Sequence, residues 1–221
     1  MGLEQGDIAV VGAGVIGLMT SLSLLDAGRS VTLIDPNPPG HGASFGNAGV
    51  IANYWVKPLA DPSLLLTGPG LLFKKDGPLA IQPGAGRAVI PWLTQFARAC
   101  LPWHQERLQK ALAAVIVDAD ARWQEVIHRV DASDAWQRKG CLYVFNDARA
   151  RRQAERDARV RQRWGVACEL LSEAELSQLE PSLSGRFEGA TFFPDAAALS
   201  DPGSITQAIA SELMRSGITI H

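Results

Sequence analysis

The sequence is poor in cysteine, with three in 221 residues: Cys100, Cys141 and Cys168. Their wide, irregular spacing matches neither a disulfide framework nor the paired ligands of a zinc site. Free cysteines of this kind usually behave as small buried hydrophobic residues. We therefore predict that all three are structural, that no metal is bound, and that the protein works in a reducing compartment.

The sequence also lacks an excess of either charge, because 21 basic side chains face 23 acidic ones and the formal net charge is -2. A nearly neutral chain has no overall attraction for nucleic acid or for acidic lipid, so any such contact needs a local patch. The 47% of hydrophobic residues excludes a disordered chain and suffices for a core.

The third feature that the sequence lacks is a recognisable targeting segment. Residues 8–25 are nearly all apolar, but residues 1–7 contain Glu4 and Asp7 and no lysine or arginine. A secretory signal needs a basic segment before its apolar run. We therefore predict no export signal, no transmembrane helix and a cytoplasmic protein.

What the sequence does contain is a strand, a glycine-rich turn, a helix and a second strand within its first 35 residues. Residues 7–11 form a short apolar run, followed by Gly12-Ala-Gly-Val-Ile-Gly17 and a helical pattern that Gly28 ends. Residues 31–35 form the next strand, which ends in an acid. This order is typical of a dinucleotide-binding unit.

The spacing has a chemical reason at each position. The first glycine permits the tight turn, the second lets the backbone approach a pyrophosphate, and the third lets the helix pack closely. The start of the helix offers N–H groups to the phosphates, and the acid can accept hydrogen bonds from ribose hydroxyls. The predicted contacts are Gly12, Gly14, Val15, Ile16, Gly17 and Asp35.

The loop after the second strand favours FAD over NAD. A run of small residues, Gly42-Ala-Ser-Phe-Gly-Asn-Ala-Gly49, exposes many backbone N–H groups and adds Ser44 and Asn47 as polar side chains. An NAD-binding unit usually continues into further helix–strand repeats, which would leave this loop unexplained.

The sequence resembles the D-amino-acid oxidase superfamily of flavoproteins, and within it the bacterial D-amino-acid dehydrogenases. The glycine motif, Asp35 and above all the small-residue loop carry this resemblance. It continues through Gly77-Pro-Leu-Ala-Ile-Gln-Pro83, Gly140-Cys-Leu-Tyr-Val-Phe145, residues 171–181, Phe193-Pro-Asp and Asp201-Pro202.

The resemblance implies that Ser44, Asn47, Ala48, Gly49 and Val50 line the ribityl chain and isoalloxazine ring. Two departures stand out: the ribose acid is Asp35 followed by proline, where the family often has Glu-Arg, and Asn47 stands where some relatives attach flavin to histidine. We therefore expect non-covalent FAD.

The resemblance implies oxidation of D-amino acids to 2-oxo acids and ammonia, with a quinone or another electron acceptor. Two alternatives stay open: a glycine- or sarcosine-type flavin amine oxidase, and a non-catalytic FAD-binding fragment that needs a partner chain. In the family, the arginine that holds the substrate carboxylate comes from the carboxy-terminal half, so no residue here is assigned a catalytic role.

The predicted fold is α/β, a Rossmann-like FAD-binding domain interleaved with an α+β substrate domain, in a chain that looks truncated. We expect the first part of the FAD domain over residues 1–53 and a mostly helical connection over 54–136, with a helical pattern over 108–130. Part of the substrate domain is expected over 137–200, and a return to the FAD domain over 201–221.

An arginine-rich helix is predicted over residues 148–164. The plain interpretation of its seven arginines is a solvated face. The functional interpretation is a basic patch that contacts anionic lipid or an electron-accepting partner. Because the similar dehydrogenases sit at the inner membrane, the resemblance adds peripheral membrane contact to the predictions.

Overall fold

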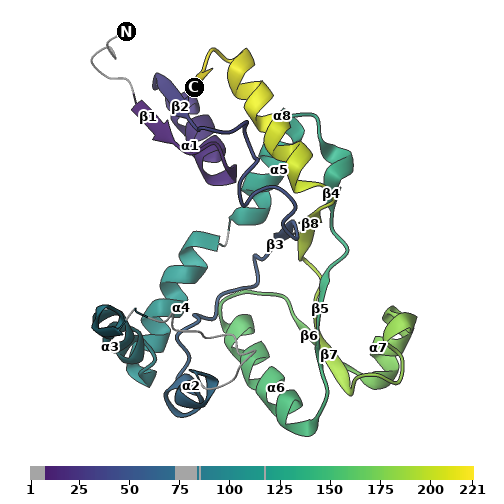
Figure 1. Ribbon diagram of the computed structural model, residues 1–221. Helices are drawn as coiled ribbons and strands as arrows, with labels where there is room; N and C mark the ends of the chain where they lie inside the picture. Colours follow the sequence, from purple (N-terminus) through teal and green to yellow (C-terminus); the bar gives the residue numbers. More distant parts are fainter. Residues whose placement is uncertain (1–7, 73–83, 85, 117) are drawn as a thin grey trace. The chain divides into compact units, whose positions relative to one another are not determined.

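The computed structural model describes residues 8–72, 84, 86–116 and 118–221 (Figure 1). The segment 77–83, which contributed to the resemblance, lies outside these residues. The described chain forms two compact units. The first unit holds residues 8–52, 118–141 and 194–221, and the second unit holds the rest, so the two are interleaved along the sequence.

The first unit contains short strands and three helices. In chain order these are β1 (Ile8–Val11), α1 (Val15–Asp26), β2 (Val31–Ile34), β3 (Val50–Ile51), α5 (Ala119–Arg129), the 3-10 turn Ser133–Ala135, β4 (Trp136–Gln137), β8 (Ala197–Leu199), α8 (Pro202–Arg215) and β9 (Thr219–Ile220). The two predicted strands and the helix between them are thus confirmed, with boundaries shifted by one residue.

Two sheets organise the first unit. The parallel sheet has the order β1-β2-β9, with Val11 opposite Ile34 and Thr32 opposite Thr219. The second sheet has the order β3-β8-β4, and both of its pairings are antiparallel. The central position of β2 means that β9, far along the chain, pairs directly with a strand formed near its start.

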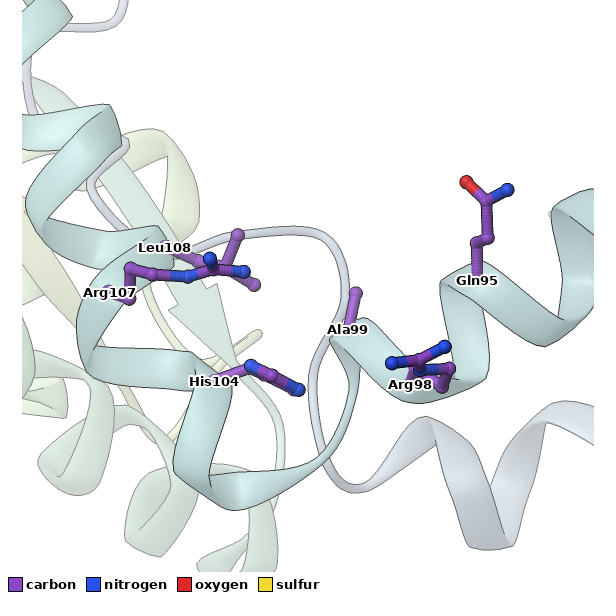
Figure 2. A pocket seen from close by; sticks show the side chains of 6 residues that line it. All are labelled: Gln95, Arg98, Ala99, His104, Arg107 and Leu108. Atoms are coloured by element: carbon purple, nitrogen blue, oxygen red, sulfur yellow. The ribbon is translucent and has the colours of Figure 1, made fainter.

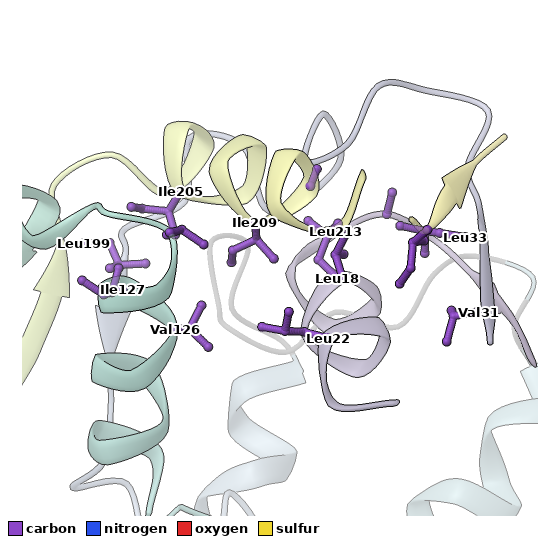
Figure 3. Packing of buried hydrophobic residues seen from close by; sticks show 14 of the residues in the cluster. Leu18, Leu22, Val31, Leu33, Val126, Ile127, Leu199, Ile205, Ile209 and Leu213 are labelled. Carbon is purple, nitrogen blue, oxygen red and sulfur yellow. The ribbon is translucent and has the colours of Figure 1, made fainter. Parts of the chain in front are cut away.

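The core of the first unit lies between its three helices and the parallel sheet (Figure 3). Leu18 and Leu22 of α1 face Ile209 and Leu213 of α8, and Val126 of α5 lies beside them. These side chains are all buried, with exposed fractions of 8% or less. Burial of a side chain of this size contributes roughly 1.5–3 kcal/mol, so the contact between helices is a main source of stability.

The second unit contains the remaining elements. They are α2 (Leu64–Leu72), the 3-10 turn Gly86–Val89, α3 (Ile90–Ala99), α4 (Pro102–Ile116), β5 (Cys141–Phe145), α6 (Ala148–Arg163), β6 (Glu169–Ser172), α7 (Glu173–Leu179), the 3-10 turn Pro181–Leu183 and β7 (Gly189–Phe193). The sheet has the order β5-β7-β6, and β6 and β7 are antiparallel. No helix in the described part of the chain is both long and apolar enough to cross a membrane.

Aromatic side chains pack against this sheet. Tyr54 is buried and stacks on Phe193 with ring centroids 4.4 Å apart, and the guanidinium of Arg161 lies 5.1 Å from the centre of the Phe193 ring. Lys57 binds Asp61 and Asp157, each at 2.8 Å, and so ties the segment before α2 to α6. Tyr54 therefore belongs to the core of the second unit.

The helical pattern predicted over residues 108–130 is present and belongs to two helices. The structure has α4 ending at Ile116 and α5 beginning at Ala119. The two helices belong to different units, because Val126 and Ile127 pack in the core of the first unit. The contact-based units also differ from the predicted boundaries, since residues 118–136 and 194–200 group with the first unit.

Candidate functional site

The glycine-rich turn joins β1 to α1 at the carboxyl end of the parallel sheet. Gly12 has a φ of 105°, a conformation that favours glycine, and its N–H donates to the Ile34 carbonyl at 2.7 Å. A Cβ at Gly17 would lie 1.8 Å from the Gly12 carbonyl oxygen. The turn and the first turn of the helix are therefore in direct backbone contact, which only glycine permits at position 17.

The amino terminus of α1 is open to a ligand. Gly14 precedes the helix without a side-chain cap, and the first turn holds no acidic residue. The helical hydrogen bonds begin with the Leu18 N–H on the Gly14 carbonyl, and Ile16 is 78% exposed. Helix geometry leaves the first N–H groups without intrahelical acceptors, and the helix dipole adds partial positive charge. The arrangement suits a phosphate group.

Asp35 lies beside this turn, at the end of β2. Its carboxylate accepts hydrogen bonds from the backbone N–H of Ala13 at 2.7 Å and of Asn37 at 2.8 Å. These bonds, that from Ala13 foremost, hold the pKa of Asp35 below its ordinary value of 3.8. A carboxylate has about four acceptor positions, so the two backbone contacts do not exhaust its capacity to accept from ligand hydroxyls.

The loop over residues 42–50 is organised by its own side chains. The Asn47 amide donates to the Ser44 carbonyl at 3.1 Å and accepts from the Gly49 N–H at 2.8 Å. Ala48 and Val50 are exposed. Gly49 is buried with a φ of 64°, and a Cβ there would lie 2.3 Å from the Leu199 carbonyl oxygen. Contact with β8 therefore requires glycine at position 49.

Ser44 connects the loop to the helix. It is only 6% exposed, and its hydroxyl accepts a hydrogen bond from the Val15 N–H at 2.9 Å. A Cβ at Gly14 would lie 3.2 Å from the same hydroxyl oxygen. The structure thus brings Gly12, Gly14, Val15, Ile16, Gly17, Asp35 and Ser44 together, with Asn47 supporting the loop from within.

Two residues of this arrangement were missed in the sequence. Ala13 gives its N–H to Asp35, and its carbonyl accepts from the Gly40 N–H at 2.8 Å. Gly40 has a φ of 80°, and a Cβ there would lie 2.1 Å from the Thr206 hydroxyl oxygen. Two features of the sequence could have identified these residues. Ala13 stands between two motif glycines, and Gly40 follows two prolines.

We expect replacement of Ser44 by alanine to destabilise the first unit by about 1 kcal/mol, because the Val15 N–H loses its acceptor. The free energy of unfolding of the two proteins in urea, measured without FAD, tests this. Ser182→Ala is a matched control, since the Ser182 hydroxyl is exposed and donates only to Glu180. Equal destabilisation by both changes would contradict the capping role.

Comparison with known proteins gives a consistent picture. The model of the DAO family, described as FAD dependent oxidoreductase, matches residues 7–221. D-amino-acid oxidase of Bradyrhizobium diazoefficiens is 31% identical over 219 residues, covering 97% of this chain and 51% of that protein. D-amino acid dehydrogenase 2 of Ralstonia nicotianae is 34% identical, covering 85% of this chain and 45% of that protein.

Among solved structures, glycine oxidase from Bacillus cereus matches with a TM-score of 0.60 and 19% identity, covering 98% of this chain and 46% of that one. At this identity the likeness is one of fold. The chain spans about half the length of the curated relatives that it matches.

Proposed function

Since the chain belongs to the DAO family of FAD-dependent oxidoreductases, we propose that the protein oxidises the CH–NH2 group of D-amino acids to 2-oxo acids and ammonia. FAD is the cofactor of the family. The observation that carries the substrate class is the similarity to proteins named D-amino-acid oxidase and D-amino acid dehydrogenase 2 along most of this chain.

The residues of the first unit fit the phosphates and ribose of FAD. The amino terminus of α1 supplies the backbone N–H groups of Gly14, Ile16 and Gly17 and positive dipole charge. Gly12 and Val15 shape the same turn, and their N–H groups donate to Ile34 and Ser44. Asp35, oriented by two backbone N–H groups, is the acceptor for the ribose hydroxyls. The close contact at Gly17 supports this proposal, because a side chain there would push the helix away from the turn.

The loop over residues 42–50 is the part of the chain proposed to meet the other end of FAD. Ser44, Asn47, Ala48, Gly49 and Val50 would line the ribityl chain and the ring. The Asn47 amide is engaged with its own loop and offers no nucleophile for attachment, which supports non-covalent binding. Exposure of Ala48 and Val50 leaves this edge of the loop accessible.

Bound FAD supplies the redox chemistry of the family, acceptance of a hydride from the substrate Cα–H. The proposed task of the first unit is to hold the cofactor in one orientation. The second unit, which holds residues 142–193 of the segment expected to form part of the substrate domain, is proposed to contribute to substrate binding. None of the described residues is proposed as a catalytic acid, base or carboxylate-binding cation.

We also propose an electron acceptor and a contact with a membrane surface. Five exposed arginines of α6 recur every three or four residues and so share one face of the helix: Arg149, Arg152, Arg156, Arg159 and Arg163. Arg163 pairs with Glu106. This face supports a peripheral contact with an anionic surface, and a quinone is the proposed acceptor.

The test is a visible absorbance spectrum of the purified full-length protein, recorded without oxygen before and after addition of D-alanine. A flavin spectrum that bleaches with D-alanine and not with L-alanine would support the proposal. Oxygen and a soluble quinone, added separately afterwards, would identify the acceptor by the recovery of absorbance.

Other results of this absorbance experiment would favour a different function. Bleaching by glycine or sarcosine alone would favour the flavin amine oxidase instead. A bound flavin that no amino acid or amine reduces would leave a non-catalytic FAD-binding protein. A colourless, folded protein would contradict the assignment of the first unit as an FAD site.

A further inference from the structure

A cleft in the second unit lies between α3 and α4 (Figure 2). Its volume is about 200 Å³. In each helix the lining residues are spaced i, i+3 and i+4, so each set of three forms one helical face. The lining residues are Gln95, Arg98 and Ala99 of α3 and His104, Arg107 and Leu108 of α4.

The lining of the cleft is basic and holds no acid. Figure 2 shows His104 and Arg107 extending from α4 toward α3, where Arg98 lies near the carboxyl end of the helix. Glu106 is the single acidic residue in α3 and α4 together, and its carboxylate pairs with Arg163 at 2.5 Å. Within the described chain, neither Arg98 nor Arg107 forms an ion pair. Among the described residues, two guanidinium groups therefore share one cleft without a counter-charge.

Contacts outside the cleft fix the two helices. The Gln105 side-chain amide donates to the Ala99 carbonyl at 3.0 Å and to the Ala60 carbonyl at 2.8 Å. The Trp164 indole N–H donates to the Gln109 side chain at 3.1 Å and so ties the far side of α4 to the end of α6. These bonds fix the helices that carry the cleft and use none of its basic side chains, which lowers the entropic cost of binding.

We propose that this cleft binds a phosphate group, either of a small soluble compound or of a phospholipid headgroup. Guanidinium groups bind phosphate through parallel, charge-assisted hydrogen bonds, and two of them match the charge of a dianion. The His104 ring adds another donor. Ala99 and Leu108 provide apolar contact for the group that carries the phosphate. This proposal does not depend on the reaction proposed above.

The test is calorimetric titration of the protein with inorganic phosphate at constant ionic strength. We expect saturable binding by the wild type and at least about tenfold weaker binding by the double variant Arg98→Ala/Arg107→Ala. Arg29→Ala/Arg186→Ala, with the same loss of charge at exposed positions outside the cleft and outside α6, should bind phosphate like the wild type. This comparison separates the cleft from the amino terminus of α1, which also attracts phosphate.

Vesicles distinguish the two sources of phosphate. Phosphatidylcholine vesicles with and without phosphatidic acid are sedimented with each variant. Binding that requires both phosphatidic acid and the two cleft arginines identifies a headgroup, whereas binding of inorganic phosphate alone identifies a soluble ligand. Arg98→Lys/Arg107→Lys keeps the charge and should bind with intermediate affinity. Absence of binding to both probes, or equal binding by the wild type and the alanine double variant, would overturn the proposal.

Discussion

Replacing Gly17 with alanine is expected to cost at least about a hundredfold in FAD affinity, equivalent to roughly 3 kcal/mol, and to lower the stability of the first unit by a similar amount. The new Cβ would lie 1.8 Å from the Gly12 carbonyl oxygen and 3.5 Å from a methyl group of Val10. Because the nearer of these two atoms belongs to the backbone, the steric clash can be relieved only if α1 moves relative to β1. That movement displaces the N–H groups proposed to hold the pyrophosphate.

The measurement combines a fluorescence titration with FAD and urea unfolding of the cofactor-free protein. Gly68→Ala in α2 is the matched control, because a Cβ there meets nothing within 4 Å and its φ is ordinary. It should change either quantity by less than about 1 kcal/mol. Wild-type affinity in the Gly17→Ala protein would refute the role given to the close contact.

Asp35→Asn is expected to weaken FAD binding by at least about tenfold at neutral pH. The carboxylate accepts from two backbone N–H groups and would also accept from the ribose, whereas an amide turns one acceptor into a donor. Asp134→Asn, which changes an exposed acid of the same unit, serves as the control. Equal affinity for FAD in the wild type and Asp35→Asn would remove Asp35 from the proposed site.

The pH dependence of stability gives Asp35 an independent test. Its pKa is lowered in the folded protein, chiefly by the Ala13 N–H, so its contribution to stability is fully present above the ordinary value of 3.8. The contribution is lost as the pH falls through the lowered pKa. The stability difference between wild type and Asp35→Asn, measured without FAD, should be constant above about pH 5 and shrink below about pH 4. A difference unchanged to pH 3 or so would exclude the ionised carboxylate as its source.

The sequence was sufficient for elements defined by local patterns. The strand–turn–helix–strand start and the arginine-rich helix α6 were both predicted close to their observed positions. In each, apolar spacing and a nearby glycine or capping residue determine the structure locally. Asp147, for example, accepts from the backbone N–H three residues later at the start of α6.

Local sequence patterns could not predict contacts between residues that are far apart in the sequence. The apolar spacing over residues 108–130 continues through the break between α4 and α5, because periodicity does not record which core a helix joins. The bond between Ser44 and the Val15 N–H spans 29 residues. The basic cleft was missed as well, although residues 95, 98 and 99 and residues 104, 107 and 108 repeat the same spacing on successive helices.

The pairing of Thr32 with Thr219 has a consequence for how the chain folds during synthesis. The β2 strand is synthesised early. The β9 strand, which pairs with one of its edges, leaves the ribosome only after all intervening residues have been translated. Until then β2 exposes unpaired N–H and carbonyl groups, a template for pairing with another nascent chain. Closing so long a loop is slow, so the newborn chain depends on protection from aggregation until α8 and β9 arrive.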